Sequence, residues 1–225
     1  MLLAIDTATR YASLALYDGS GVVSEWSWYS ENNHSVEVLP AIAAMLAQQG
    51  LYPDDLSAVA VAKGPGSFTG LRIGMSIAKG LCLALEMPII AIPTLDVTTY
   101  AVGDPGGPIY AVLEAGRGRI CVARYHFEEG LPVQEGEIEL VSAAEWTPTG
   151  EDLDPLLVAG EVNAELAERL LSSEAEIAVS SLAGSLRRAG YLAELAWEAF
   201  QDERFDDLDT LGPIYAHYPS SGTAD

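Results

Sequence analysis

The sequence predicts an α/β fold made of two related lobes, each a duplicated unit of β-sheet plus helices. Residues 59–85 read as a strand, a Gly/Pro turn and about four turns of apolar helix. Residues 2–29 read as three antiparallel strands joined by short polar turns. The segment 3–17 returns in weaker form at 111–125, at an offset of 108. This self-similarity indicates an internal duplication.

The expected elements follow from hydrophobic periodicity and turn residues. In the first lobe we expect strands at 2–6, 12–17, 22–29, 56–62 and 88–93, with helices at 35–49 and 70–86. Later we expect strands at 156–160 and 177–179, a helix at 163–171, helices over 181–200 broken near Gly190, and an extended piece at 211–218. The Gly/Pro-rich segment 103–108 reads as a hinge. The predicted domains are a first lobe of 1–103 plus about 191–218, a smaller, degenerate second lobe of 104–190, and a tail of 219–225.

The turn after the strand at 56–62 is rich in glycine but matches no common site motif. A P-loop and a dinucleotide fingerprint both require glycine at the place of Thr69. A nucleophile elbow requires glycine two residues on either side of Ser67, where Pro65 and Thr69 stand. By motif spacing alone, a packing role for this turn is favoured over a phosphate-binding role, and both stay open.

Two predicted helices carry more apolar surface than one packing face needs. The helix at 35–49 has two adjacent apolar stripes, and the helix at 70–86 is apolar over most of its circumference, with small residues every four positions that would admit another helix. At about 1.5 Å per residue the second helix is too short to cross a bilayer core of about 30 Å. We expect a partner protein to cover these helices at Val38, Leu39, Ile42, Met45, Leu46, Leu71, Gly74, Met75, Ala78 and Cys82.

Charge and cysteine content limit the function further. The net charge is −22; residues 1–125 carry 7 basic and 11 acidic side chains, and residues 126–225 carry 4 and 22. Such a surface repels RNA, so any role in RNA chemistry requires another subunit to hold the RNA. Cys82 and Cys121 lack the spacing of a metal site, and no leader-like segment follows Met1. We therefore expect reduced thiols in a cytoplasmic protein.

The three histidines predict no metal site. None of His34, His126 and His217 lies four residues from another, so a helical histidine pair is not expected. For His34 we expect a capping or surface role.

The three antiparallel strands, with Asp6 at the first turn, resemble the opening of the actin-like ATPase superfamily (ASKHA, ribonuclease H-like). In that superfamily the first hairpin wraps the phosphates of ATP, and this aspartate helps to hold the metal–phosphate group. The alternative for Asp6 is a residue that caps its own turn. Under the duplication, Glu114 is the counterpart of Asp6 in the second lobe.

Longer strings carry a more specific resemblance. These are Leu-Ala-Ile-Asp-Thr-Ala at 3–8, His34-Ser35 followed by Leu39-Pro40, Gly-Pro-Gly-Ser-Phe-Thr-Gly-Leu-Arg-Ile-Gly at 64–74, and Ala-Lys-Gly-Leu at 78–81. With them the sequence resembles the bacterial TsaB (YeaZ) family, the glycoprotease (M22)-like branch of the superfamily. The match is strong over about the first hundred residues and weak up to Pro213-Ile214-Tyr215.

The resemblance implies a non-catalytic dimerization or scaffold subunit. Its complex forms N6-threonylcarbamoyladenosine at position 37 of tRNAs that read ANN codons, and the subunit binds and activates its catalytic homologue TsaD. The implied further partner is the ATPase TsaE. We expect contact with tRNA only indirectly, no membrane, and a homodimer when the chain is alone. ATP and Mg are expected only at the level of the complex, with no cofactor on this subunit.

On the same resemblance, the turn is a vestigial nucleotide or phosphate loop. Its residues are Asp6, Thr7, Gly64, Pro65, Gly66, Ser67 and Gly70, and no catalytic or metal-binding residue is predicted. An ATP-dependent small-molecule kinase of the same superfamily is the alternative, with Asp6 and Glu114 near metal–phosphate. A peptidase is disfavoured because no Ser/His/Asp set is evident.

Overall fold

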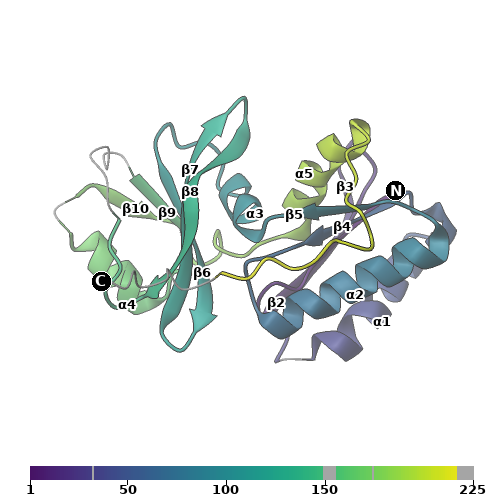
Figure 1. Ribbon diagram of the computed structural model, residues 1–225, viewed down its shortest axis with the longest axis horizontal. Coiled ribbons are helices and arrows are strands. Elements are labelled where there is room, and N and C mark those ends of the chain that lie inside the picture. The colour runs from purple at the N-terminus through teal and green to yellow at the C-terminus, as the bar shows by residue number, and fades with distance from the viewer. Residues whose placement is uncertain (32, 149–155, 174, 217–225) are drawn as a thin grey trace, which may run out of the picture. The chain divides into compact units, whose positions relative to one another are not determined.

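The computed structural model describes residues 1–31, 33–148, 156–173 and 175–216. The chain divides into two compact units. The first is formed by Met1–Val97 with Arg187–Ile214, and the second covers Thr98–Leu186, with Tyr215 and Ala216 of the described chain. In Figure 1 the chain leaves the first unit after β5 and returns to it at α5.

The first unit is built on a mixed sheet of five strands within the described residues, in the order β3-β2-β1-β4-β5. Its elements are β1 Leu2–Asp6, β2 Tyr11–Tyr17, β3 Val22–Tyr29, α1 His34–Gln48, a short 3-10 turn Pro53–Asp55, β4 Ala58–Ala62, α2 Phe68–Leu85, β5 Ile89–Ile92 and α5 Ala189–Gln201, and α3 Thr94–Tyr100 begins in it. Helices α1 and α2 cover one face of this sheet, and α5 packs against the strands from the other face (Figure 1).

The second unit repeats this strand order. Its elements are β6 Ile109–Gly116, β7 Arg119–Glu128, β8 Leu131–Ser142, β9 Leu156–Gly160, α4 Ala164–Leu171 and β10 Ile177–Val179. Its sheet runs β8-β7-β6-β9-β10 in the described residues, which is the order of β3-β2-β1-β4-β5. In both units the first two strands pair antiparallel, while the first and fourth strands pair parallel. The two-lobed, duplicated fold predicted from the sequence is thereby confirmed.

The two hairpins differ in register. Leu2 pairs with Tyr17 in the first hairpin, whereas Ile109 pairs with Tyr125 in the second. With an offset of 108, one strand of the first hairpin matches its counterpart in the second, and the other strand is then out of register by one residue. Asp6 and Glu114 therefore do not occupy identical pairing positions. Glu114 is exposed, and its backbone N–H donates to Glu161 Oε2 at 3.1 Å.

The core of the first unit lies between the sheet and the two N-terminal helices. Alternate residues of a strand point to opposite faces, so Leu3 and Ile5 of β1 face α1 and α2. Val38 and Met45 of α1 and Met75 of α2 complete this cluster. Cys82 and Cys121 are both free and buried, and burial raises the pKa of each thiol to about 11. Each therefore behaves as small apolar filler.

Several boundaries differ from the predicted ones. Residues 98–103 belong to the second unit, and the predicted hinge at 103–108 lies inside it. Residues 187–190 belong to the first unit because Ala189 N–H donates to Ser13 Oγ at 2.8 Å and Gly190 N–H to Glu25 Oε1 at 2.7 Å. The predicted tail of 219–225 lies outside the described residues.

Of the two helices predicted over 181–200, the second is found as α5, which begins at Ala189, one residue before Gly190. The first is wrong, because 182–186 form turns and a bend rather than a helix. Glycine suits position 190 because a Cβ there would lie 2.8 Å from the Glu25 carboxylate that caps the helix. The 12-residue strand β8 was not anticipated.

Among the described helices, α2 alone is long and apolar enough by length and composition to cross a membrane. Six of its residues, Gly70, Leu71, Gly74, Met75, Ala78 and Cys82, are buried in the unit.

Candidate functional site

The Gly/Pro turn lies against the first hairpin. Ser67 N–H donates to the carbonyl of Ala8 at 2.6 Å, and Thr7 Oγ1 donates to the carbonyl of Gly70 at 2.8 Å. Ser67 also caps α2, because its Oγ accepts from Gly70 N–H at 3.2 Å. The structure thus brings together the predicted loop residues Asp6, Thr7, Gly64, Pro65, Gly66, Ser67 and Gly70.

The glycines of this turn serve close packing. A Cβ at Gly66 would lie 2.3 Å from the carbonyl oxygen of Ala8, and one at Gly70 would lie 2.2 Å from that of Thr7. At Gly74 it would lie 2.3 Å from Thr7 Oγ1. The small residues of α2 therefore receive the β1–β2 turn, and the expectation that they admit another helix is wrong.

Asp6 is neutralised inside its own unit. Arg187 Nε donates to Asp6 Oδ2 at 3.1 Å, and the two side chains are 3% and 1% exposed. Ala8 N–H donates to the other carboxylate oxygen, Oδ1, at 2.8 Å. Arg187 Nη2 also donates to Thr9 Oγ1 at 2.7 Å. Both oxygens of the carboxylate that would face a metal–phosphate group are engaged by the chain itself.

The polar groups of the first hairpin and of the turn are largely used within the chain. A carboxylate holds a metal through an oxygen that is open to it, and here one oxygen accepts from a guanidinium and the other from a backbone amide. The turn's amides of Gly64, Ser67 and Gly70 also have protein acceptors. In the described part of the chain, no group of three or more His, Cys, Asp or Glu is arranged to hold a metal ion.

His34 joins the same buried network. Its ring is 4% exposed, and Nε2 lies 2.9 Å from the carbonyl oxygen of Thr9. Nε2 therefore carries the proton in this bond, since a carbonyl only accepts. The expected capping or surface role of His34 is wrong, because Asn33 is the N-cap of α1 and the buried ring bonds to the first hairpin instead.

Sequence reasoning missed Arg187 and Thr9. The signal available was the pair Arg187-Arg188, two of only 4 basic residues in the strongly acidic segment 126–225. A buried arginine requires an acidic partner, but nothing in the sequence connects position 187 with position 6.

The predicted partner-contact residues are for the most part core residues. Val38, Ile42, Met45, Leu46, Leu71, Gly74, Met75, Ala78 and Cys82 are all buried. Of the ten predicted positions Leu39 alone is exposed, at 51%. The reason is that α1 and α2 pack on the sheet and on each other, and these contacts bury the most apolar stripe of each helix. The prediction that these ten residues are exposed to a partner is therefore wrong for all of them except Leu39.

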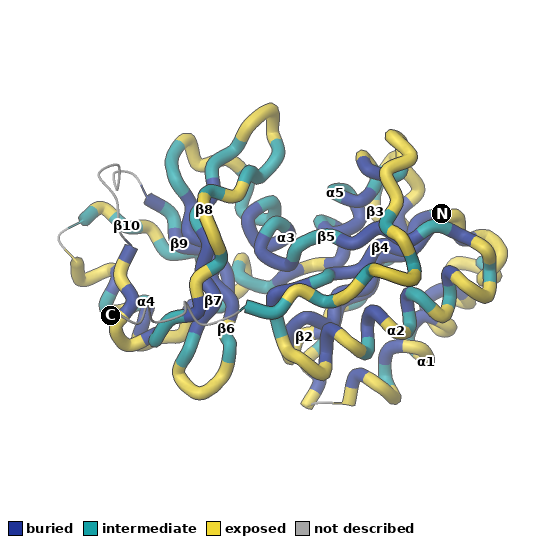
Figure 2. The backbone as a smooth tube through the Cα atoms, viewed as in Figure 1, coloured by how far each residue is buried: buried dark blue, intermediate teal, exposed yellow. Residues whose placement is uncertain are grey.

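The outer surface of the same helices is nevertheless apolar. Figure 2 shows exposed residues along the outer sides of α1 and α2. We define the α1–α2 surface by its exposed or half-buried apolar side chains, Val36, Leu39, Phe68, Ile73, Ile77 and Leu83.

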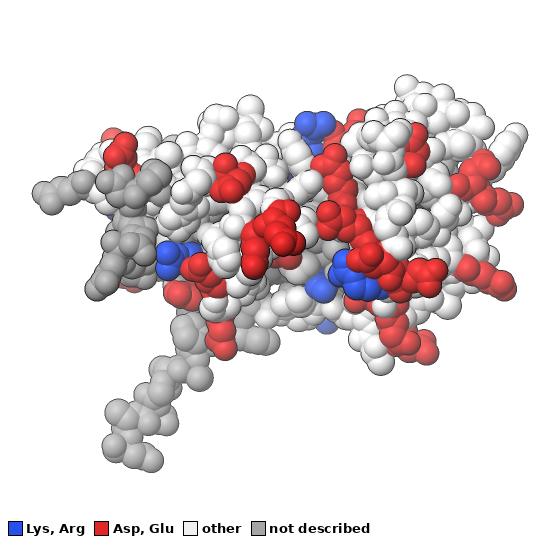
Figure 3. All heavy atoms as spheres, turned by 90° about the horizontal axis from the view of Figure 1, so that it is seen from above, with Lys and Arg blue, Asp and Glu red and all other residues white. Residues whose placement is uncertain are grey.

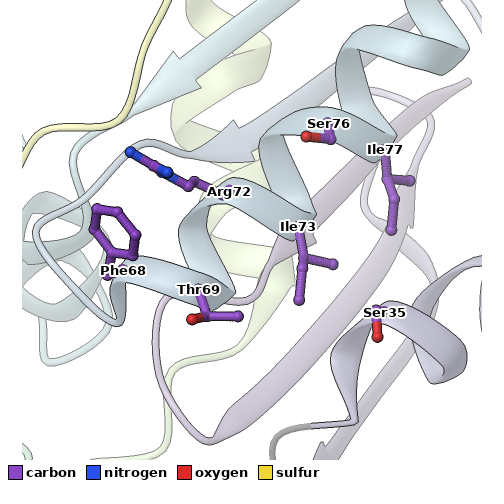
Figure 4. A pocket seen from close by; sticks show the side chains of 7 residues that line it. All are labelled: Ser35, Phe68, Thr69, Arg72, Ile73, Ser76 and Ile77. Carbon is purple, nitrogen blue, oxygen red and sulfur yellow. The ribbon is translucent and has the colours of Figure 1, made fainter.

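An open hollow of about 380 Å³ lies in the α1–α2 surface. It is lined by Ser35, Phe68, Thr69, Arg72, Ile73, Ser76 and Ile77. Figure 4 shows Ile73 and Ile77 on the side of α2 toward Ser35 of α1, and Phe68 beside Arg72 at the helix start. The Arg72 guanidinium carbon stands 3.7 Å from the Phe68 ring centroid.

Comparison with known proteins identifies the family. A family model described as TsaD, tRNA N6-adenosine threonylcarbamoyltransferase, matches residues 10–214. The chain is 36% identical over 160 residues to the tRNA threonylcarbamoyladenosine biosynthesis protein TsaB of Bacillus subtilis, covering 71% of this chain and 70% of that one. The chain belongs to the TsaB (YeaZ) family.

A second relative and a solved structure agree with this assignment. The TsaB protein of Escherichia coli is 36% identical over 130 residues, which cover 57% of this chain and only 56% of that relative. The structure of YeaZ from Pseudomonas aeruginosa has a TM-score of 0.80 at 24% identity and covers 95% of this chain and 98% of that one. Another structure from this organism, titled as similar to peptidase YeaZ, also has a TM-score of 0.80 at 24% identity, covering 96% and 99%. These structural likenesses support the two-lobed actin-like fold of the family.

Proposed function

We propose that this chain is a non-catalytic subunit in the biosynthesis of N6-threonylcarbamoyladenosine at position 37 of tRNA, and that it binds and activates TsaD. The TsaB-named relatives support the pathway. In this proposal tRNA is held elsewhere in the complex, because a net charge of −22 opposes RNA binding. The complex, with TsaE and ATP and Mg, works in the cytoplasm.

The observation that carries the non-catalytic role is the ion pair of Asp6 with Arg187. A phosphate-binding hairpin needs its carboxylate free for the metal, whereas here the guanidinium already neutralises it at 3.1 Å. The same observation counts against a kinase. If pure chain binds Mg-ATP tightly in isothermal titration, Asp6 is not blocked and the non-catalytic proposal fails.

The α1–α2 surface is the proposed docking site for TsaD, and for a second copy when TsaD is absent. It presents Leu39 and Leu83, at 51% and 67% exposure, in addition to the hollow that Arg72 lines. A contact that buries about 800 Å² on each side is ordinary for such a complex.

The deciding experiment is reconstitution. Purified TsaD, TsaE and a TsaC-type synthase are incubated with tRNA, threonine, bicarbonate and Mg-ATP, with and without this chain, and the modified nucleoside is quantified by mass spectrometry. We expect its formation to depend on this chain. Equal formation without the chain contradicts the proposal, as does formation by this chain without TsaD.

Leu39→Asp is expected to weaken the complex with TsaD at least about tenfold, because a charge would be buried without a partner. The measurement is isothermal titration of TsaD into the variant. Leu182→Asp is the matched control, since Leu182 is 84% exposed and lies in the second unit. Unchanged affinity of Leu39→Asp would place the docking site elsewhere.

A further inference from the structure

A row of aromatic side chains lies along α5, apart from the α1–α2 surface. The ring centroids of Tyr17 and Trp197 are 5.6 Å apart, those of Trp197 and Phe200 5.2 Å, and those of Phe200 and Phe205 6.1 Å. Tyr17 is buried, Trp197 and Phe200 are half-buried, and Phe205 is 44% exposed. We name these four residues the α5 aromatic row.

The backbone fixes the exposed end of this row. Arg204 N–H donates to the carbonyl of Ala199 at 2.8 Å, and Asp206 N–H donates to that of Ile89 at 3.0 Å. Asp206 Oδ2 also accepts from Ala91 N–H at 2.7 Å. Phe205 therefore stands between two anchored residues, and little conformational entropy is lost when a ligand contacts it.

Carboxylates border the row. Glu194 and Glu198 lie on α5 beside Trp197, and Asp202 and Glu203 lie between Phe200 and Phe205. Burial, followed by the charges of Glu194 and Asp18, raises the pKa of Tyr17. Figure 3 shows Asp and Glu gathered in clusters on the visible face, where they outnumber Lys and Arg.

Little positive charge offsets these carboxylates within the described segment 189–214. Arg204 is its one basic residue, and it pairs with Asp202 at 3.1 Å. Arg188, at the start of α5, pairs with Glu25. Lys79 of α2 also reaches this segment, where its Nζ donates to the carbonyl of Leu211 at 2.7 Å. Acidic side chains nevertheless outnumber basic ones within the segment.

We propose that the α5 aromatic row docks a basic, apolar peptide segment of a partner protein. Arginine and lysine match both features, because a cation is attracted to the exposed ring of Phe205 and to the carboxylates around it. Nucleic acid and anionic membranes are repelled by the same carboxylates, and two copies of this chain that met through this row would bring these carboxylates face to face. A basic protein segment is the occupant whose positive charge complements the carboxylates of this surface.

The test uses the full chain and a synthetic twelve-residue peptide of alternating arginine and leucine, capped at both ends. Binding is measured by isothermal titration at about 0.15 M salt, where charges beyond roughly 8 Å are screened. A twin peptide with glutamate in place of arginine is the ligand control. We expect the arginine peptide to bind and the glutamate peptide not to bind.

Two variants locate the binding. Glu194→Gln with Glu198→Gln is expected to weaken it about fivefold or more, and Phe205→Leu, which keeps an apolar side chain, about threefold. Glu137→Gln with Glu139→Gln, on exposed positions of β8, removes the same charge elsewhere and is expected to change affinity less than about twofold. Urea unfolding of each variant confirms that the fold is retained.

Absence of binding at millimolar peptide overturns the proposal. An equal loss in the α5 and β8 variants also overturns it, because binding would then follow net charge alone. Undiminished binding by Phe205→Leu would exclude a role for the aromatic row.

Discussion

Arg187→Met is expected to lower the free energy of unfolding by about 3–5 kcal/mol, because it leaves the Asp6 carboxylate buried without its cation. Urea denaturation followed by circular dichroism measures this change. Arg188→Met is the matched control at the adjacent position. The side chain of Arg188 is 51% exposed and that of its partner Glu25 is 12% exposed, whereas both side chains of the Asp6–Arg187 pair are at most 3% exposed. The loss from Arg188→Met should therefore be the smaller of the two.

The double variant Asp6→Asn with Arg187→Met separates charge from packing. An asparagine at position 6 keeps an oxygen that accepts from Ala8 N–H but carries no charge. The double variant should therefore recover most of the stability that Arg187→Met loses. If Arg187→Met costs no more than Arg188→Met, Asp6 has another compensating partner.

Gly70→Ala is the second large effect, with an expected loss of about 3 kcal/mol from overpacking. The new Cβ would lie 2.2 Å from the backbone carbonyl of Thr7, which cannot swing away as a side chain can. Gly80→Ala on the same helix is the control. A methyl group at Gly80 would meet nothing within 4 Å, so alanine should gain about 1 kcal/mol there through helix propensity.

A further pair tests the packing role of these glycines. Gly74→Ala meets Thr7 Oγ1, a side-chain atom, so Thr7→Ala should relieve part of its cost and none of the cost of Gly70→Ala. Thermal unfolding of the single and double variants provides the comparison. A Gly70→Ala protein as stable as the parent chain would show that the β1–β2 turn can retreat from α2.

The sequence was sufficient for the five strands of the first unit and for α1 and α2, because their patterns are local. The strand at 2–6 follows from its apolar run, and the helix predicted at 70–86 is found as α2, which begins two residues earlier, at Phe68. The duplication was also visible, since both hairpins begin with a short apolar strand and a carboxylate.

What covers each apolar face could not be read in the same way. Periodicity places Met75 and Ile42 on the apolar faces of their helices, but it does not show whether a partner protein or the chain's own sheet covers them. The excess apolar surface was real, yet it lies at Leu39 and Leu83 rather than at the most regular stripe. The contact of Asp6 with Arg187 joins residues separated by 181 positions, and no local pattern encodes it.

The first unit is made of two segments that are separated in the sequence by the second unit, and this affects the order in which the protein can fold during translation. The segment Thr98–Leu186 is synthesised as one continuous piece. In contrast, Asp6 cannot form its ion pair until Arg187 has been synthesised. Domains generally fold as units while the ribosome elongates the chain. The chain made before Arg187 therefore lacks the cation that pairs with Asp6, and this buried ion pair can form only after position 187 has been synthesised.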